Sequence, residues 1–222
     1  MAELSTLPEY MLRNAREMGD QPAMREKYLG IWKTYTWSQY AQEVREFALG
    51  LASLDFKRGD KLGIIGNNLP KLYWAQVAAQ SIGGTAVPVY QDAIAKELAY
   101  VLRHSEAKVI VAEDQEQVDK ILSIKDELPG LEYLIYCDPR GMTDYDDAKL
   151  KSYDDVRLAG QTFAASNSSY FDDEVGKTTE IEIALMCYTS GTTGNPKGVL
   201  LSHEHLLANA GRFVDAEGIR PD

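Results

Sequence analysis

One stretch of the sequence gathers residue types that could bind a polyphosphate. It runs from Tyr188 to Gly198 and reads Tyr-Thr-Ser-Gly-Thr-Thr-Gly-Asn-Pro-Lys-Gly. Its glycines let the backbone approach a ligand closely, so that successive N–H groups can point at one anion. Threonine hydroxyls are donors that can also join a magnesium shell, and a lysine supplies a point charge. The residues that we predict to contact phosphate are Thr189, Ser190, Gly191, Thr192, Thr193, Gly194 and Lys197.

Other interpretations of this region fit the residues less well. A Walker A loop needs glycine where Pro196 stands and serine or threonine where Gly198 stands. A flexible hairpin without a ligand would explain a shorter glycine- and threonine-rich turn, but not all eleven residues. His203 and His205 do not suggest a metal site, because helix positions two apart diverge by about 200°. We expect exposed histidines there, on a helix capped by Ser202.

Short apolar runs alternate with amphipathic segments along the rest of the chain. The runs predict strands over 61–66, 85–90, 108–112, 132–136, 183–188 and 199–202. The periodic segments predict helices over 37–54, 69–82, 93–104, 115–128 and 203–216. Thr36 and Gln39 have the spacing of a capping box at the start of the first of these helices. Alternating strands and helices predict an α/β fold with a layered, largely parallel sheet and flanking helices.

A few features fall outside this pattern. Residues 138–180 are acidic and poor in apolar periodicity, which predicts an irregular excursion with one short helix near 152–160. Trp32, Trp37 and Trp74 are interpreted as core residues or as contacts between subdomains. His104 ends a predicted helix, where a cation suits the helix dipole, so we expect a structural role for it.

The overall charge and hydropathy exclude several classes of function. A net charge of -11 argues against a broad nucleic-acid-binding face, which would have to be basic. No run approaches the ~20 apolar residues of a membrane-spanning helix. The N-terminus does not resemble a signal peptide, and two cysteines suit a reducing compartment, so a cytoplasmic location is expected. Peripheral membrane contact and a homodimer stay open, although no basic amphipathic helix supports the former.

The phosphate-binding stretch, extended to His203, resembles the AMP-binding signature of the adenylate-forming superfamily. That superfamily includes acyl-CoA synthetases, luciferases and the adenylation domains of peptide synthetases. Upstream, Gly59–Asn68 resembles its "G-D-x-V-A-I" strand and following turn, and Gly83–Tyr90 resembles its "G-A-V-x-V-P-x-Y" strand. Leu98–Val109 resembles a segment of long-chain acyl-CoA synthetases. The resemblance covers nearly the whole chain and is most specific over 188–198.

The resemblance implies a two-step reaction. A carboxylic acid, here a medium- or long-chain fatty acid, would attack Mg-ATP to give an acyl-adenylate and pyrophosphate, and coenzyme A would then displace AMP. The implied cofactors are therefore ATP, Mg²⁺ and coenzyme A as co-substrate. The loop would hold the β- and γ-phosphates, with Thr189 as the magnesium partner. Lys197 would be the catalytic residue, because its charge would stabilise the departing pyrophosphate.

The same resemblance implies that residues 1–222 are an incomplete N-terminal AMP-binding domain. The remainder of that domain and a C-terminal lid domain would carry the adenine, ribose and acyl pockets, so the chain alone is expected not to be catalytic. Two alternatives stay open, one that keeps adenylation of an acid and one without catalysis. One is an acyl-AMP ligase or an amino-acid adenylation domain, and the other is a non-catalytic nucleotide-binding or interaction module.

Overall fold

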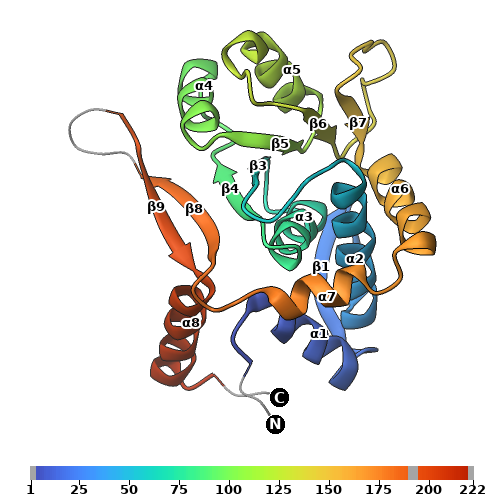
Figure 1. Ribbon diagram of the computed structural model, residues 1–222, viewed down its shortest axis with the longest axis vertical. Helices are drawn as coiled ribbons and strands as arrows, with labels where there is room; N and C mark the ends of the chain where they lie inside the picture. The colour runs from blue at the N-terminus through green and yellow to red at the C-terminus, as the bar shows by residue number, and fades with distance from the viewer. Residues whose placement is uncertain (1–3, 190–194, 220–222) are drawn as a thin grey trace.

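The computed structural model describes residues 4–189 and 195–219. Two strands, β1 (Pro22–Tyr28) and β2 (Ile31–Thr36), form a separate antiparallel hairpin. The others are β3 (Lys61–Ile65), β4 (Thr85–Val89), β5 (Ala107–Ala112), β6 (Tyr133–Tyr136), β7 (Leu150–Ser152), β8 (Ile183–Thr189) and β9 (Lys197–Ser202). They form one sheet in the order β7-β6-β5-β3-β4-β8-β9, in which every neighbouring pair except β8–β9 is parallel (Figure 1). The predicted α/β fold with a largely parallel sheet is confirmed.

The predicted helices are also present. The helices are α1 (Leu7–Glu17), α2 (Trp37–Ser53), α3 (Pro70–Ser81), α4 (Ala95–His104), α5 (Gln115–Ser123), the 3-10 turn η1 (Lys125–Glu127), α6 (Tyr153–Ser166), α7 (Tyr170–Lys177) and α8 (His203–Glu217). The capping box of α2 is confirmed: the Thr36 hydroxyl accepts from the Gln39 N–H at 3.3 Å, and the Gln39 side chain accepts from the Thr36 N–H at 2.9 Å. In the described residues, none of these helices has the length and apolar character needed to cross a bilayer.

The sheet separates two apolar cores, as expected for a sheet covered by helices on both faces. Side chains alternate between the faces along each strand. In β5, Val109 and Val111 enter the core under α2 and α3, whereas Ile110 and Ala112 enter the core under α4 and α5. Figure 1 shows the two groups of helices on opposite sides of the strands.

The order of the central strands places a topological switch between β3 and β5. The chain passes from β3 to β4 on one side and then returns to β5 on the other. Loops after β3 and β5 therefore leave in different directions, and the Asn67 N–H donates to the Glu113 carboxylate across the gap at 2.5 Å. In doubly wound folds, ligands bind beyond the carboxyl ends of such strands. Because β8 is parallel to β4, the stretch that follows β8 also leaves from this edge.

The helix predicted near 152–160 is present as α6, but the irregular character predicted for the rest of 138–180 was only partly right, because this region also contains β7 and α7. In α6, acidic residues alternate with a small set of buried residues, so the overall composition does not reveal the buried face. In α6, Tyr153 stacks on Phe47 of α2 with ring centroids 4.2 Å apart, and Val156 is buried beside it. Ser152 caps the helix by accepting from the Asp155 N–H at 3.0 Å.

Two glycines explain how closely α6 approaches α2. A Cβ on Gly160 would lie 1.9 Å from the Glu46 carbonyl oxygen, and one on Gly50 would lie 2.1 Å from the Val156 carbonyl oxygen. Such contacts are with backbone atoms, which cannot move aside. The helix–helix contact therefore requires glycine at both positions.

The three tryptophans have different environments. Trp74 is buried and packs edge-on against Tyr35 with ring centroids 5.0 Å apart, so its predicted core position is confirmed. Trp37 is half-buried at the start of α2. The prediction for Trp32 as a core or subdomain contact is not met within the described chain, where it is 64% exposed near the tip of the β1–β2 hairpin.

Candidate phosphate-binding site

The residues predicted to contact phosphate lie on the hairpin formed by β8 and β9. The register pairs Thr189 with Lys197 and Tyr188 with Gly198. Directly opposed residues share one face of a hairpin, with Cβ atoms about 5 Å apart. The Thr189 hydroxyl and the Lys197 ammonium therefore leave the same face at the open end, and both residues are exposed. Of the other predicted contacts, Ser190, Gly191, Thr192, Thr193 and Gly194 lie outside the described residues.

Tyr188 occupies the opposite face of the hairpin. Its ring lies across Gly198, where an added Cβ would be 3.3 Å from the Tyr188 ring and 3.4 Å from Met186. A side chain at position 198 would press against the tyrosine and Met186, so glycine here lets these two side chains lie close to β9.

The Tyr188 ring holds the hairpin against α4. Its hydroxyl lies 2.6 Å from His104 Nδ1, and the two rings meet edge-on with centroids 5.7 Å apart. Tyr100 stacks on the other side of His104. Burial raises the pKa of Tyr188, and Tyr100 adds to that effect, so the phenol stays protonated and able to donate to the imidazole. The structural role expected for His104 is thus a contact with the residue that precedes Thr189.

Side chains fasten the base of the hairpin to the sheet. Backbone pairing between β4 and β8 is limited to Ala86 and Leu185. Gln80 donates to the Ala184 carbonyl at 3.0 Å, and Thr85 donates to the Ile183 carbonyl at 2.9 Å. Beyond this base the two strands extend away from the sheet, as Figure 1 shows. The candidate phosphate ligands are therefore at the outer end of an arm that is fixed at its base.

An ion cluster secures the segment that leads into β8. Arg58 contacts the Glu182 carboxylate at 2.5 Å and the Glu174 carboxylate at 2.9 Å. Burial raises the pKa of Glu174, but hydrogen bonds from Lys177 and Arg58 outweigh this and lower it overall. Gly83, at φ +75°, makes room for the guanidinium, because a Cβ there would lie 2.4 Å from it.

The far end of β9 continues directly into α8. The predicted cap is confirmed: the Ser202 hydroxyl accepts from the His205 N–H at 3.2 Å. The expectation that both histidines are exposed was wrong for His203, which is buried. Its ring Nδ1 accepts from the Leu7 backbone N–H at 3.3 Å, and the backbone N–H of His203 donates to the Glu182 carbonyl. Burial lowers the pKa of His203, so it remains a neutral imidazole that joins α8 to the start of α1.

The chain was compared with protein families and with known proteins. The family model described as "AMP-binding enzyme" matches residues 11–221. The chain belongs to the AMP-binding enzyme family.

Among curated members of this family, the long-chain-fatty-acid–CoA ligase ACSBG2 of Xenopus laevis is 31% identical over 218 residues. The alignment covers 94% of this chain and 28% of the relative. The long-chain-fatty-acid–CoA ligase heimdall of Drosophila melanogaster is 29% identical over 207 residues, which cover 91% of this chain and 30% of the relative. The chain therefore spans less than a third of the length of these curated relatives.

Solved structures of similar fold include CoA ligases. The anthranilate CoA ligase AuaEII, in complex with anthranoyl-AMP, has a TM-score of 0.77 at 21% identity and covers 93% of this chain and 36% of its own. A putative long-chain-fatty-acid CoA ligase from Rhodopseudomonas palustris has a TM-score of 0.73 at 21% identity. The match covers 98% of this chain and 49% of the ligase. At these identities the likeness establishes the fold of this chain.

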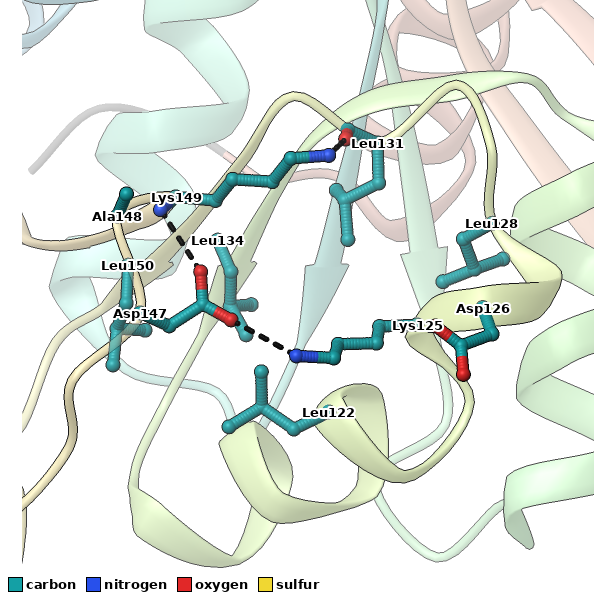
Figure 2. Close-up of a pocket in the computed structure, with 10 residues that line it drawn as sticks. All are labelled: Leu122, Lys125, Asp126, Leu128, Leu131, Leu134, Asp147, Ala148, Lys149 and Leu150. Atoms are coloured by element: carbon teal, nitrogen blue, oxygen red, sulfur yellow. Dashed lines mark hydrogen bonds and ion pairs between the residues drawn. The ribbon is translucent and has the colours of Figure 1, made fainter.

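A separate cavity of about 370 Å³ lies near α5, β6 and β7, and Figure 2 shows its lining residues. Leucines from α5, from the segment before β6 and from the β6–β7 edge line it, and three of its charged residues already have partners. Lys125 lies 3.3 Å from the Asp147 carboxylate, and Lys149 donates to the Leu131 carbonyl at 2.7 Å. It sits at the opposite edge of the sheet from β9, so it has no part in the phosphate-binding site.

The metal prediction rests on Thr189 alone. Within residues 4–189 and 195–219, no group of three or more His, Cys, Asp or Glu is arranged to hold a metal ion. A threonine hydroxyl beside a lysine fits magnesium that arrives already bound to phosphate, because magnesium keeps most of its shell as water and phosphate oxygens.

What sequence reasoning missed is the contact between Tyr188 and His104, since nothing in the local pattern links residues 84 positions apart.

Proposed function

We propose that this chain forms the first part of an ATP-dependent acyl-CoA synthetase. The enzyme would convert a medium- or long-chain fatty acid into an acyl-adenylate and then into acyl-CoA, with release of pyrophosphate and AMP. The observation that carries the proposal is the register of the β8–β9 hairpin, which presents Thr189 and Lys197 on one face. The names of the curated relatives, long-chain-fatty-acid–CoA ligases, support the class of acid.

Lys197 would act on the charge that develops as pyrophosphate leaves. A fixed ammonium near the leaving oxygens stabilises the transition state more than the ground state, where the charge is still shared with the α-phosphate. Thr189 would orient the same phosphates through its hydroxyl. Mg²⁺, when bound with ATP, would supply further neutralisation of the phosphate oxygens. The Tyr188–His104 contact would hold Thr189 in place while the loop engages the nucleotide.

The surface of α8 and β9 supports the view that the domain is incomplete in this chain. Val199, Leu200, Phe213, Val214 and Ile219 are all exposed. The apolar positions of α8 have the periodicity of a buried face, yet Phe213 is 59% exposed. We propose that a further part of the synthetase packs on α8 and around β9 and brings the adenine, ribose and acyl pockets to the loop. The chain alone would then bind nucleotide weakly and would not turn over.

The test is carboxylate-dependent ATP–pyrophosphate exchange by the full polypeptide that carries this chain. A panel of fatty acids, aryl acids and amino acids serves as substrate, and coenzyme A is added in a second series. We expect exchange with fatty acids and acyl-CoA formation once coenzyme A is present. Lys197→Ala should lower the exchange rate about a hundredfold or more, as when one oxyanion-stabilising donor is lost.

Lys57→Ala is the matched control. Lys57 precedes β3 at the amino edge of the sheet, and among the described residues its ammonium pairs only with exposed Asp55, so its loss should leave exchange unchanged. Exchange with amino acids alone, or stable acyl-adenylate that coenzyme A does not consume, would support an adenylation domain or an acyl-AMP ligase instead. A folded protein that shows no exchange with any acid would be a non-catalytic nucleotide-binding module.

A further inference from the structure

The tip of the β1–β2 hairpin exposes a cluster of large apolar side chains. The apolar tip consists of residues 28–32, Tyr-Leu-Gly-Ile-Trp. Leu29 is 81% exposed, Ile31 70% and Trp32 64%. Single exposed apolar residues are ordinary on protein surfaces, but a contiguous group of them marks a site of interaction. The apolar tip is therefore a candidate contact surface, separate from the phosphate-binding hairpin.

Turn geometry does not account for the residue at the apex. Leu29 has φ +48° and Gly30 has φ +83°, so both central residues of the turn have positive φ. Turns of this kind favour asparagine, aspartate or glycine at the first position, because other residues are strained there. Leucine therefore occupies a position that suits it neither by backbone conformation nor by burial within the described chain.

Cations surround the apolar tip in a protein that is otherwise acidic. Arg25, Lys27 and Lys33 form what we call the basic collar. Lys27 lies 6.0 Å from the Trp32 ring centroid, and Lys33 lies 4.7 Å from that of Tyr28. Glu26 accepts a hydrogen bond from Tyr35 at 2.6 Å, on the side toward the core. The collar is thus positive locally, although the whole chain carries a net charge of -11.

The hairpin presents these groups in a fixed order. The register pairs Tyr28 with Ile31 on one face and Lys27 with Trp32 on the other. At the base, Met24 and Tyr35 pack against the main core. The chain thus runs from an anchored base, through the basic collar, to an apex that is apolar on both faces.

We propose that the apolar tip inserts into the head-group region of an anionic lipid bilayer while the basic collar contacts the lipid phosphates. Tryptophan and tyrosine favour this interface, where one part of the ring is apolar and the other meets water. Lysine and arginine next to them are attracted to anionic lipids. A stable protein partner would need about 800 Å² on each side, from roughly 20 residues, which a five-residue tip does not provide.

The test is co-sedimentation of the full polypeptide with vesicles of equal parts phosphatidylcholine and phosphatidylglycerol, without ATP or substrate. We expect binding to these vesicles and much weaker binding to phosphatidylcholine alone. The variant Leu29→Asn/Ile31→Thr should bind at least tenfold more weakly. It should fold, because asparagine accepts positive φ and threonine suits a strand.

Ile181→Thr is the matched control, since Ile181 is 72% exposed at a different site and loses the same apolar group. The charge variant Lys27→Gln/Lys33→Gln should weaken binding to the anionic vesicles, about fivefold for each lysine. Trp32 fluorescence should shift to shorter wavelength when vesicles are added, and Trp32→Phe should remove that shift.

Several outcomes would overturn the proposal. Equal vesicle binding by the parent and by Leu29→Asn/Ile31→Thr would mean that another surface contacts lipid. A change in oligomeric state on substitution of the tip, without vesicle binding, would mean that the tip contacts a second copy. Trp32 emission that is already shifted before vesicles are added would mean that the rest of the polypeptide covers the tip. Because no nucleotide is present, none of these results depends on the proposed catalytic activity.

Discussion

Two hairpins project from this protein, and they differ in what they carry. The β8–β9 hairpin ends in hydroxyl residues and a lysine, whereas the β1–β2 hairpin ends in large apolar side chains. Their anchoring differs in the same way. Hydrogen bonds from Gln80 and Thr85 fix the first at its base, while Met24 and Tyr35 fix the second by packing. One type of scaffold can therefore present either a polar or an apolar contact surface, depending on the residues at its end.

The largest expected effect comes from removing one lysine from each hairpin and measuring both ATP–pyrophosphate exchange and vesicle binding for each variant. Lys197→Ala should reduce ATP–pyrophosphate exchange about a hundredfold or more and leave vesicle binding unchanged. Lys33→Ala should leave exchange unchanged and weaken vesicle binding about fivefold. Both variants remove one exposed lysine from a hairpin, so each is the control for the other. If either substitution altered both readouts, the two hairpins would not be independent sites.

The two hairpins also differ near their ends. Tyr188 joins the end of β8 to His104 of α4, whereas no such hydrogen bond to a helix is found for the apolar tip of β1–β2 among the described residues. Tyr188→Phe removes a hydroxyl that lies 2.6 Å from His104 Nδ1. We expect the KM for ATP to rise several-fold, and the free energy of unfolding to fall by about 1 kcal/mol, the usual contribution of one hydrogen bond.

Tyr145→Phe is the matched control for this variant. Tyr145 also uses its hydroxyl, toward Asp119 and Gln115, but at a surface far from β8. An unchanged KM in Tyr188→Phe would show that His104 does not position the loop. Equal changes in both variants would indicate a general loss of stability.

The strained apex of β1–β2 predicts a gain in stability together with a loss of binding. Leu29→Asn relieves positive φ at a residue that disfavours it, so the free energy of unfolding should rise by about 1 kcal/mol. Urea denaturation measures this change. Leu158 is exposed on the outer side of α6. Leu158→Asn should instead lower the free energy of unfolding by a few tenths of a kcal/mol, because asparagine is a poorer helix former than leucine. A loss of stability in Leu29→Asn would mean that the leucine packs against something in the folded protein.

Local patterns predicted the central sheet and its helices well. Apolar runs such as those in β3 and β5 are buried on both faces, and their alternation with amphipathic helices leaves little ambiguity about a parallel sheet. The capping signals of Thr36 and Ser202 also worked, because they depend on residues only three apart. The strands predicted on either side of the phosphate-binding stretch are present, but they extend further than predicted and include Thr189 and Lys197.

Long-range contacts could not be predicted in this way. The close packing of α6 on α2 was missed because it depends on glycines about 110 residues apart along the chain, Gly50 and Gly160. Trp32 was misjudged because tryptophan is usually buried, and only the position of its hairpin shows that it is not. His203 was misjudged because its partner, Leu7, lies near the other end of the chain.

His203 gives the smallest effect, and it concerns the link between the two hairpins. Its imidazole accepts from Leu7, just before α1, and so joins the segment that leads to β1 with the helix that follows β9. Burial lowers the pKa of His203 in the folded protein, so the unfolded chain binds a proton more readily. The stabilising contribution of the neutral ring is therefore present above the unfolded pKa of about 6.5 and is lost as pH falls below it. The free energy of unfolding should therefore decrease from pH 7.5 to pH 5.5.

The variant His203→Gln should lose this part of the pH dependence, and His205→Gln should keep it. His205 is exposed, and glutamine can replace it in the capping box of α8, so the second variant changes a histidine without changing the link to Leu7. Urea denaturation at the two pH values compares them with the parent. If all three proteins had the same pH dependence, protonation of His203 would not control the joint between α1 and α8.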